Sequence, residues 1–230
     1  MRKFAFLVVL FLGFSSSAFA DILTENFNSV SSLSGSGWVG VNNSNPPGFT
    51  GWFQGNSGIF GAQSGPADSY IGANFLNSDS GNISNWLITP EMDLANAILL
   101  TFFTRTDPGS GFADRLEVRL STNGASTDVG ATDSSVGDFT VLLLSINPTL
   151  DPDGYPSDWT QFSVALSGLG NGAQGRLAFR YNVSDTTVNG NYIGIDTVNV
   201  VATPEPATLS LLLLGVAALG SRRFSRKRAA

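Results

Sequence analysis

Carboxylates are the side chains of this sequence best suited to acid–base or metal chemistry. The chain contains 18 Asp and Glu residues but no histidine and no cysteine. It therefore cannot build a Ser–His or Cys–His nucleophile system, the usual zinc sites or a histidine general base. The remaining options are pairs of carboxylates, metal sites made of oxygen ligands, and aromatic rings on which a ligand can stack.

Two pairs of carboxylates are close enough in sequence to serve a glycoside hydrolase, which needs two acids about 5–10 Å apart. They are Asp114 with Glu117 and Asp151 with Asp153. Glu117, however, has one arginine two residues before it and another two residues after it, on the same strand face. These cations favour the ionised carboxylate and lower its pKa, whereas a general acid needs a raised pKa. We therefore predict that the protein is not an enzyme.

Aromatic residues offer a second kind of site, because sugar rings stack on exposed aromatic faces. Trp52 and Phe53 lie in a Gly-rich stretch and are the best candidates for an exposed ligand-binding platform. The alternative is that these rings fill the core, as bulky residues do in β-sandwiches. For Trp86 and Trp159, which lie inside predicted strands, we favour the core.

β-Strands must position these side chains. The clearest strand is 114–122, in which Leu116, Val118 and Leu120 alternate with charged residues at a period of two. The stretch 175–184 alternates in the same way. Further strands are predicted at 23–27, 69–75, 85–89, 98–106, 140–146, 159–167 and 192–201.

The number and spacing of these strands indicate the fold class. Nine or so short strands without crossover helices are typical of an all-β, antiparallel sandwich. We predict that the first and last strands pair and close the domain, as in a jelly-roll. The Gly- and Asn-rich stretch 41–65 is either a long loop or a pair of irregular strands.

The N-terminal end has the pattern of a secretory signal peptide. Arg2 and Lys3 precede an apolar run over 4–14, and the stretch 18–20 reads Ala-Phe-Ala. This is the charged region, the short apolar region and the small-residue cleavage site of such a peptide. We therefore assign residues 1–20 to a signal peptide and predict export across the inner membrane.

The exported part of the chain is acidic. Its only cations are five arginines, whereas all 18 Asp and Glu residues lie between Asp21 and Glu205, which gives a net charge of about −13. Such a charge argues against nucleic acid or an anionic membrane surface as a partner. We expect the arginines to pair with carboxylates across neighbouring strands, or else to bind an acidic polysaccharide if several share one face. They are Arg105, Arg115, Arg119, Arg176 and Arg180.

The C-terminal end combines Pro204, Glu205 and Pro206 with an apolar run over 207–220 and five Lys or Arg residues within 222–228. As a helix the apolar run rises about 21 Å, so it predicts a short or tilted transmembrane helix. The basic cluster then stays cytoplasmic. The two prolines keep the stretch before the helix extended and accessible. We favour a sorting tail that is removed, over a permanent anchor or a buried core helix.

The order of these features resembles a known combination of domain and signal. The body resembles the choice-of-anchor J domain, which is related to the cleaved-adhesin domain, over residues 21–201. The tail 202–230 resembles the PEP-CTERM sorting signal. Together they imply a jelly-roll domain exported by a Gram-negative, exopolysaccharide-producing bacterium and processed at the tail by an exosortase. The blocks that carry the resemblance are GWFQGN (51–56), SNWLITPEMDL (84–94), TFFTRT (101–106), ADRLEVRLSTNG (113–124), VGDFTVLLLSINP (136–148), GYPSDWTQF (154–162), GRLAFRYNV (175–183), NYIGIDTVNV (191–200) and PEP (204–206).

The resemblance also implies a structural calcium ion, because related sandwich domains commonly bind one where the first and last strands meet. Calcium takes carboxylate and carbonyl oxygens as ligands. If the first and last strands pair, Glu25 and Asp196 converge, with Asp114 as a weaker third ligand. The alternative is that these carboxylates are solvated or pair with arginines.

These observations predict an exported protein of the cell surface or extracellular matrix. Its partners are an exosortase and, transiently, the inner membrane. We predict a non-enzymatic structural or adhesive module, with a carbohydrate-binding module for exopolysaccharide as the alternative and a polysaccharide hydrolase as the third possibility.

Overall fold

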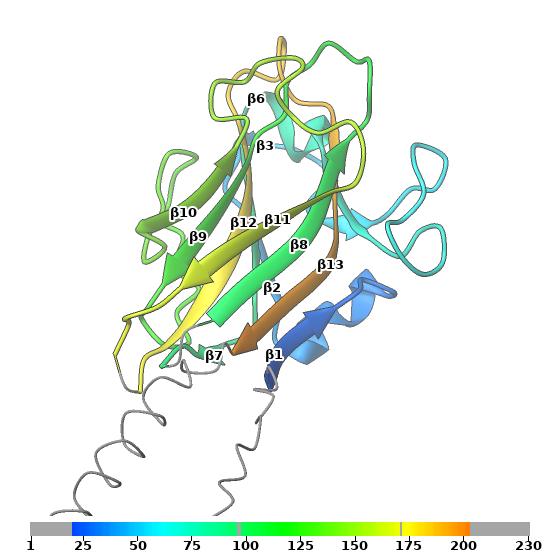
Figure 1. Cartoon of the computed structure of the whole chain (residues 1–230). Helices are drawn as coiled ribbons and strands as arrows, with labels where there is room; N and C mark the ends of the chain where they lie inside the picture. The colour runs from blue at the N-terminus through cyan, green and yellow to red at the C-terminus, as the bar shows by residue number, and fades with distance from the viewer. Residues whose placement is uncertain (1–19, 96–97, 171, 203–230) are drawn as a thin grey trace, which may run out of the picture.

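The structure is a computed structural model that describes residues 20–95, 98–170 and 172–202. These residues form two antiparallel β-sheets that pack face to face (Figure 1). The first sheet contains β1 (Ala20–Glu25), β4 (Phe53–Gln54), β5 (Ile71–Asn74), β8 (Ile98–Thr106), β11 (Thr160–Leu166) and β13 (Tyr192–Ala202). The second contains β2 (Val39–Asn42), β3 (Asn45–Pro47), β6 (Ser78–Ile88), β7 (Met92–Asp93), β9 (Leu116–Ser121), β10 (Val141–Ile146) and β12 (Gln174–Val183).

In the first sheet the strand order is β11–β8–β13–β5–β4, with β1 beside β13. In the second it is β10–β9–β12–β6–β2, with β3 beside β6 and β7 beside β12. The helices of the described chain are two short 3₁₀ helices, η1 (Val30–Ser36) and η2 (Phe75–Asn77). The predicted all-β antiparallel sandwich is confirmed, and the narrower jelly-roll assignment stays a prediction.

All nine predicted strands are present, and the alternation of buried residues is clearest along β8. Along β8 every second residue is buried, from Ile98 to Thr106, and the residues between them are half-buried. The short strands β2, β3, β4 and β7 were not predicted. They are two to four residues long, which is too short for alternation to be recognised. For the stretch 41–65 the sequence left open a long loop or a pair of irregular strands, and the structure has short irregular strands there.

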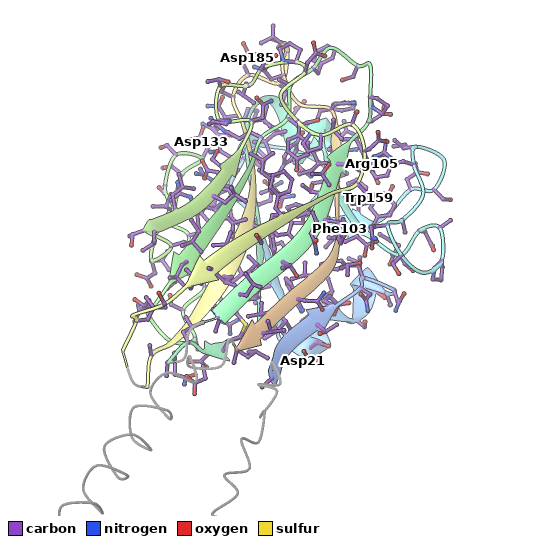
Figure 2. The ribbon with its side chains drawn as sticks, in the orientation of Figure 1. Asp21, Phe103, Arg105, Asp133, Trp159 and Asp185 are labelled. Atoms are coloured by element: carbon purple, nitrogen blue, oxygen red, sulfur yellow. The ribbon has the colours of Figure 1, made fainter. Side chains whose placement is uncertain are left out.

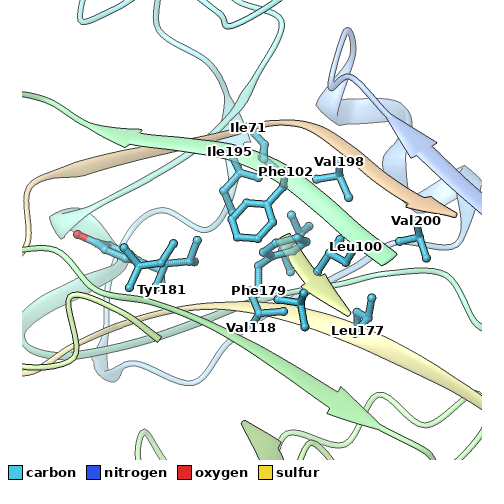
Figure 3. Close-up of a cluster of buried hydrophobic side chains, with 14 of the residues drawn as sticks. Ile71, Leu100, Phe102, Val118, Leu177, Phe179, Tyr181, Ile195, Val198 and Val200 are labelled. Atoms are coloured by element: carbon cyan, nitrogen blue, oxygen red, sulfur yellow. The ribbon is translucent and has the colours of Figure 1, made fainter. Parts of the chain in front are cut away.

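The core lies between the two sheets and takes side chains from both. Phe102 of β8 and Phe179 of β12 meet edge to face, with ring centroids 5.0 Å apart. Aliphatic side chains of both sheets surround this pair (Figure 3). Burial of such apolar surface is the main stabilising contribution to a domain that has no disulfides.

Loops cover the outer faces of both sheets with additional aromatic clusters. On the second sheet, Trp86 packs against Phe139 of the loop before β10, with ring centroids 5.8 Å apart. On the first sheet, Phe60 of the loop between β4 and β5 packs against Tyr70 and Tyr192. Trp86 is fully buried, as predicted, although it belongs to this outer cluster and not to the core between the sheets.

The first and last strands pair, as predicted. Ala20 lies opposite Ala202, so the described chain begins and ends at one pole of the sandwich. In Figure 1 this pole is at the bottom, where β1 starts and β13 ends. Tyr192 starts β13 at the opposite pole, and a strand of this length spans about 33 Å. The two poles can therefore serve different purposes.

Candidate functional site

The predicted sorting residues Pro204, Glu205 and Pro206 lie outside the described residues, as do the predicted transmembrane helix over 207–220 and most of the predicted signal peptide. Ala20, the last residue of that predicted peptide, is the first residue of β1. No helix within the described ranges is long and apolar enough to cross a membrane. What the structure adds is the position of Ala202, which ends β13 at the pole shared with β1.

Asp196, the first predicted calcium ligand, fastens a loop to the first sheet. Its Oδ2 accepts hydrogen bonds from the backbone N–H groups of Gln63 at 2.9 Å and Ser64 at 3.2 Å. Its Oδ1 accepts from the backbone N–H of Thr197 at 2.6 Å. Burial raises the pKa of Asp196, and these hydrogen bonds oppose that effect. Both carboxylate oxygens are therefore occupied by protein donors.

Glu25, the second predicted ligand, lies on the strand next to Asp196 but on the opposite face of the sheet. Residues directly opposite each other in an antiparallel pair share a face. Glu25 lies opposite Val198, which is in the core, whereas Asp196 lies opposite Phe103 on the outer face. A β-bulge between Asp196 and Asn199 shifts the register and separates the two carboxylates in this way.

Asp114, the third predicted ligand, is buried at the pole of Tyr192. Its carboxylate accepts hydrogen bonds from the hydroxyls of Thr106 and Tyr181 and, at 2.8 Å, from the backbone N–H of Asn191. The described chain contains no group of three or more His, Cys, Asp or Glu residues that could hold a metal ion. The three predicted carboxylates therefore do not form a common set of calcium ligands.

Trp52 and Phe53, the predicted platform, are both half-buried. Trp52 packs against the core, and its buried indole N–H has no hydrogen-bond partner among the described residues. Phe53 packs against Tyr192, with ring centroids 5.8 Å apart. The structure thus uses these rings largely for packing, the alternative that the sequence left open.

Arg105 packs against the neighbouring aromatic cluster of Phe60, Tyr70 and Tyr192. The guanidinium of Arg105 lies over the ring of Phe60, 4.5 Å from its centroid. Trp159 donates its indole N–H to the carbonyl of Gly61 at 2.8 Å. Figure 2 shows Arg105 and Trp159 near each other beside this loop, with Phe103 closer to the start of β8. Arg105 and Trp159 therefore fix the loop between β4 and β5 to the first sheet through their contacts with Phe60 and Gly61.

A second polar cluster lies on the outer face of the second sheet, around Glu117. Glu117 forms ion pairs with Arg119, at 2.7 Å, and with Arg180 of the neighbouring strand β12, at 3.3 Å. Burial acts to raise the pKa of Glu117, but the hydrogen bond and charge of Arg119 and the charge of Arg180 outweigh it and lower the pKa. This confirms the direction expected from sequence, and it makes Glu117 unsuitable as a general acid. Arg115, on the same face, instead donates to the backbone carbonyls of Asn182 and Pro148.

Sequence reasoning missed a cavity of about 370 Å³ at the pole of Tyr192. It lies between the segments 106–114 and 152–157, which are some 40 residues apart in the chain. The stretch 107–112 reads DPGSGF, directly after a well-predicted strand. A Gly-rich segment at a strand end is the one signal that could have indicated a functional loop.

Comparison with known proteins adds a sorting signal. Residues 202–228 match the PEP-CTERM protein-sorting motif, which agrees with the predicted sorting residues. The chain therefore carries the signal of proteins that are exported and sorted by an exosortase. No curated protein matches the chain significantly.

Several solved structures share the fold. The K3 cleaved adhesin domain of Lys-gingipain from Porphyromonas gingivalis is 18% identical, with a TM-score of 0.56, and the match covers 81% of this chain and 100% of that domain. The K1 domain from the same organism is 23% identical, with a TM-score of 0.55 and coverage of 79% and 98%. The K2 domain of Lys-gingipain is also 23% identical, with a TM-score of 0.53 and coverage of 79% and 99%. These likenesses confirm the expected relation to the fold of cleaved adhesin domains, and the narrower choice-of-anchor J assignment stays a prediction.

Proposed function

We propose that the protein is sorted by an exosortase to the cell surface or extracellular matrix and acts there as a non-enzymatic adhesive or structural module. The observation that carries this proposal is the sorting motif, whose match begins at Ala202, the last residue of the last strand. The inner membrane is then a transient partner. Removal of the tail releases the acidic sandwich outside that membrane.

The arrangement of the strands supports this order of events. Ala20 pairs with Ala202, and the cleavages that we propose fall after Ala20 and beyond Ala202, next to this one pole of the sandwich. Cleavage after Ala20 removes only the first residue of β1, so the pairs that Asp21 to Glu25 form with β13 stay in the sheet. The opposite pole, with its loops, faces away from the processed end and is free to meet a partner.

An adhesive role is supported by the fold and by the carboxylates. The structural neighbours from Lys-gingipain are named as cleaved adhesin domains. In this chain Glu117 is ion-paired and Asp196 is hydrogen-bonded on both oxygens. Carboxylates held in this way suit a structural role better than proton transfer.

The sorting step is tested by replacing Pro204, Glu205 and Pro206 with alanine in the producing bacterium. The wild-type protein is expected outside the inner membrane without its tail, and the variant in the membrane fraction with its tail. Mass spectrometry of both fractions distinguishes the two forms. Wild-type protein recovered outside the cell with residues 211–228 still attached contradicts the proposal. Attachment of a deletion strain to surfaces, with and without the restored gene, tests the adhesive role separately.

A structural calcium ion also stays a proposal, with Glu25 as its remaining carboxylate ligand. Oε1 of Glu25 accepts a hydrogen bond from the backbone N–H of Phe27 at 2.8 Å, and Oε2 has no partner among the described residues. Oxygens of this kind are calcium ligands. A chelator should then lower the unfolding temperature of the wild-type protein and leave that of Glu25→Gln unchanged. An equal response of both proteins contradicts a role for Glu25.

A further inference from the structure

The cavity at the pole of Tyr192 has the size of a small-molecule site. Its volume of about 370 Å³ lies in the range of known ligand pockets. One wall is the segment 106–114, which follows β8, and the other is the segment 152–157, which precedes β11. Both walls belong to loops at the end of the sandwich opposite Ala202 (Figure 1).

Hydrogen bonds fasten the two walls to each other at their base. The backbone N–H of Thr106 donates to the carbonyl of Pro156 at 2.8 Å. Arg105 donates to the carbonyls of Thr106 and Ser157, one from each wall. The cavity therefore exists before any ligand arrives, which lowers the entropic cost of binding.

The side-chain amide of Asn147 provides a third connection. Its Nδ2 donates to the carbonyl of Asp114 at 2.9 Å and to the carbonyl of Asp151 at 2.8 Å. Its Oδ1 accepts from the backbone N–H of Asp151 at 2.9 Å. Asn147 thus holds Asp151, which leads into the wall 152–157, close to Asp114, the last residue of the wall 106–114.

The floor of the cavity consists of polar groups that already have partners. Asp114 is only 1% exposed, and Thr106, Tyr181 and Asn191 donate to its carboxylate. The hydroxyl of Tyr155 is hydrogen-bonded to that of Thr104 at 2.6 Å. Burial raises the pKa of Asp114, but these donors enclose the carboxylate and separate it from a ligand in the cavity. The floor is therefore structural.

The groups left for a ligand are the more exposed residues of the two walls. The side chains of Asp107 and Asp153 have no hydrogen-bond or ion-pair partner within the described part of the chain. Phe112 is 43% exposed, and its backbone N–H is held by the hydroxyl of Ser110 at 3.1 Å. Gly111, with a φ of +73°, makes the turn that brings Phe112 to the rim.

We infer that this cavity is a non-catalytic binding site for the end of a neutral oligosaccharide. Carboxylates accept hydrogen bonds from sugar hydroxyls, and bonds to a charged acceptor are strong. An exposed aromatic ring packs against the apolar C–H face of a sugar, which buries it from water. No Lys or Arg side chain is among the described residues that line the cavity. Asp107 and Asp153 therefore repel a uronic acid and select a neutral sugar.

The inference deepens the proposed function and rests on it, since the ligand is met only outside the inner membrane. The cavity lies at the pole opposite Ala202, so a sandwich held or released at that residue presents the cavity outward. It would supply the contact through which an adhesive module binds a polysaccharide.

Binding is measured with the full-length chain, purified in a detergent that contains no sugar. The probes are cellotetraose and β-1,4-galactotriose as neutral oligosaccharides and oligogalacturonate as an acidic one, with isothermal titration as the readout. The binding variants are the double substitution Asp107→Asn with Asp153→Asn, and Phe112→Ala. The matched controls are Asp158→Asn, which lies beyond the cavity on the same loop, and Phe49→Ala, an exposed ring elsewhere. Unfolding curves of all variants are recorded to check that each one is folded.

We expect the wild-type protein to bind a neutral probe and to bind oligogalacturonate more weakly. Each binding variant should lose affinity by about tenfold or more, and the controls should keep the wild-type affinity. Unchanged affinity in both folded binding variants overturns the inference, as does preferential binding of oligogalacturonate. Cleavage of a bound probe overturns the non-catalytic assignment. Absence of binding to every probe overturns the inference of a sugar site. Recovery of tail-free protein outside the cell would still support the sorting proposal in that case.

Discussion

The carboxylate of Glu117 lies 2.7 Å from Nε of Arg119, two residues further along β9. The same carboxylate also pairs with Arg180 of β12, whose guanidinium lies over the ring of Trp86, 4.8 Å from its centroid. One acidic side chain thus pairs with two cations on a face that the loop before β10 covers. Removing that single negative charge leaves a buried arginine without a carboxylate partner.

Glu117→Gln should therefore lower the free energy of unfolding at pH 7 by about 2–4 kcal/mol, because Arg180 is left buried and unpaired. The pKa of Glu117 is lowered in the folded protein. Its contribution is thus fully present above its ordinary pKa and is lost as the pH falls through the folded value. The difference between wild type and variant, measured by urea unfolding from pH 7 to pH 3.5, should shrink with falling pH. The exposed Glu91→Gln is the control, with an expected change within about 0.5 kcal/mol. A difference that stays constant with pH contradicts the assignment.

Asp196→Ala should release the loop between β4 and β5. The substitution removes the acceptor for the backbone N–H groups of Gln63 and Ser64. Losing these hydrogen bonds to a buried carboxylate should cost about 1–3 kcal/mol of stability. Hydrogen exchange should speed up at residues 60–65 and stay unchanged in β9, and the exposed Asp79→Ala should change neither. Equal exchange of the loop in wild type and Asp196→Ala would show that other contacts hold it.

The positions of the long strands were largely predictable from sequence because each is rich in apolar residues and bounded by turn-forming residues. Only along β8 does every second side chain lie buried, whereas β6, β12 and β13 bury several consecutive residues. Ile98–Thr106 has the predicted bounds, and the pairing of the first and last strands follows from their positions in the chain. The separation of Glu25 from Asp196 was not predictable, since it depends on a bulge. Thr197 has a φ of +50° there, a conformation uncommon for a non-glycine residue. No residue type in the sequence marks that position.

The cavity could not be predicted for a different reason. Its walls come from segments that the sequence separates by some 40 residues, and they meet only because β8 and β11 are neighbours in the first sheet. The platform prediction at Trp52 and Phe53 was made from local composition alone. Composition does not distinguish a ring that points into solvent from one that packs beneath a loop.

Trp52→Ala should act on stability and not on sugar binding. The indole packs partly against the core, and truncating a half-buried aromatic side chain costs about 2–3 kcal/mol, somewhat less than for a fully buried one. The variant should unfold at a lower urea concentration, while its affinity for a neutral oligosaccharide stays that of the wild type. Phe49→Ala, which truncates a side chain that is 86% exposed, should change neither quantity. Loss of sugar affinity in folded Trp52→Ala would instead support the prediction from sequence that Trp52 and Phe53 form the ligand-binding platform.

Gly154→Ala should disturb the cavity through Asn147. A Cβ atom at this position would lie 2.3 Å from Oδ1 of Asn147, whose amide is held by Asp114 and Asp151. Because that amide cannot move without losing these hydrogen bonds, overpacking should cost about 1–3 kcal/mol of stability. The displaced wall should also weaken the binding of a neutral oligosaccharide.

Gly61→Ala is the matched control, since a Cβ there meets no atom within 4 Å, and it should leave stability and binding unchanged. If Gly154→Ala binds the sugar as tightly as Gly61→Ala does, then the position of Asn147 does not shape the site, and Arg105 and Thr106 alone hold the walls together.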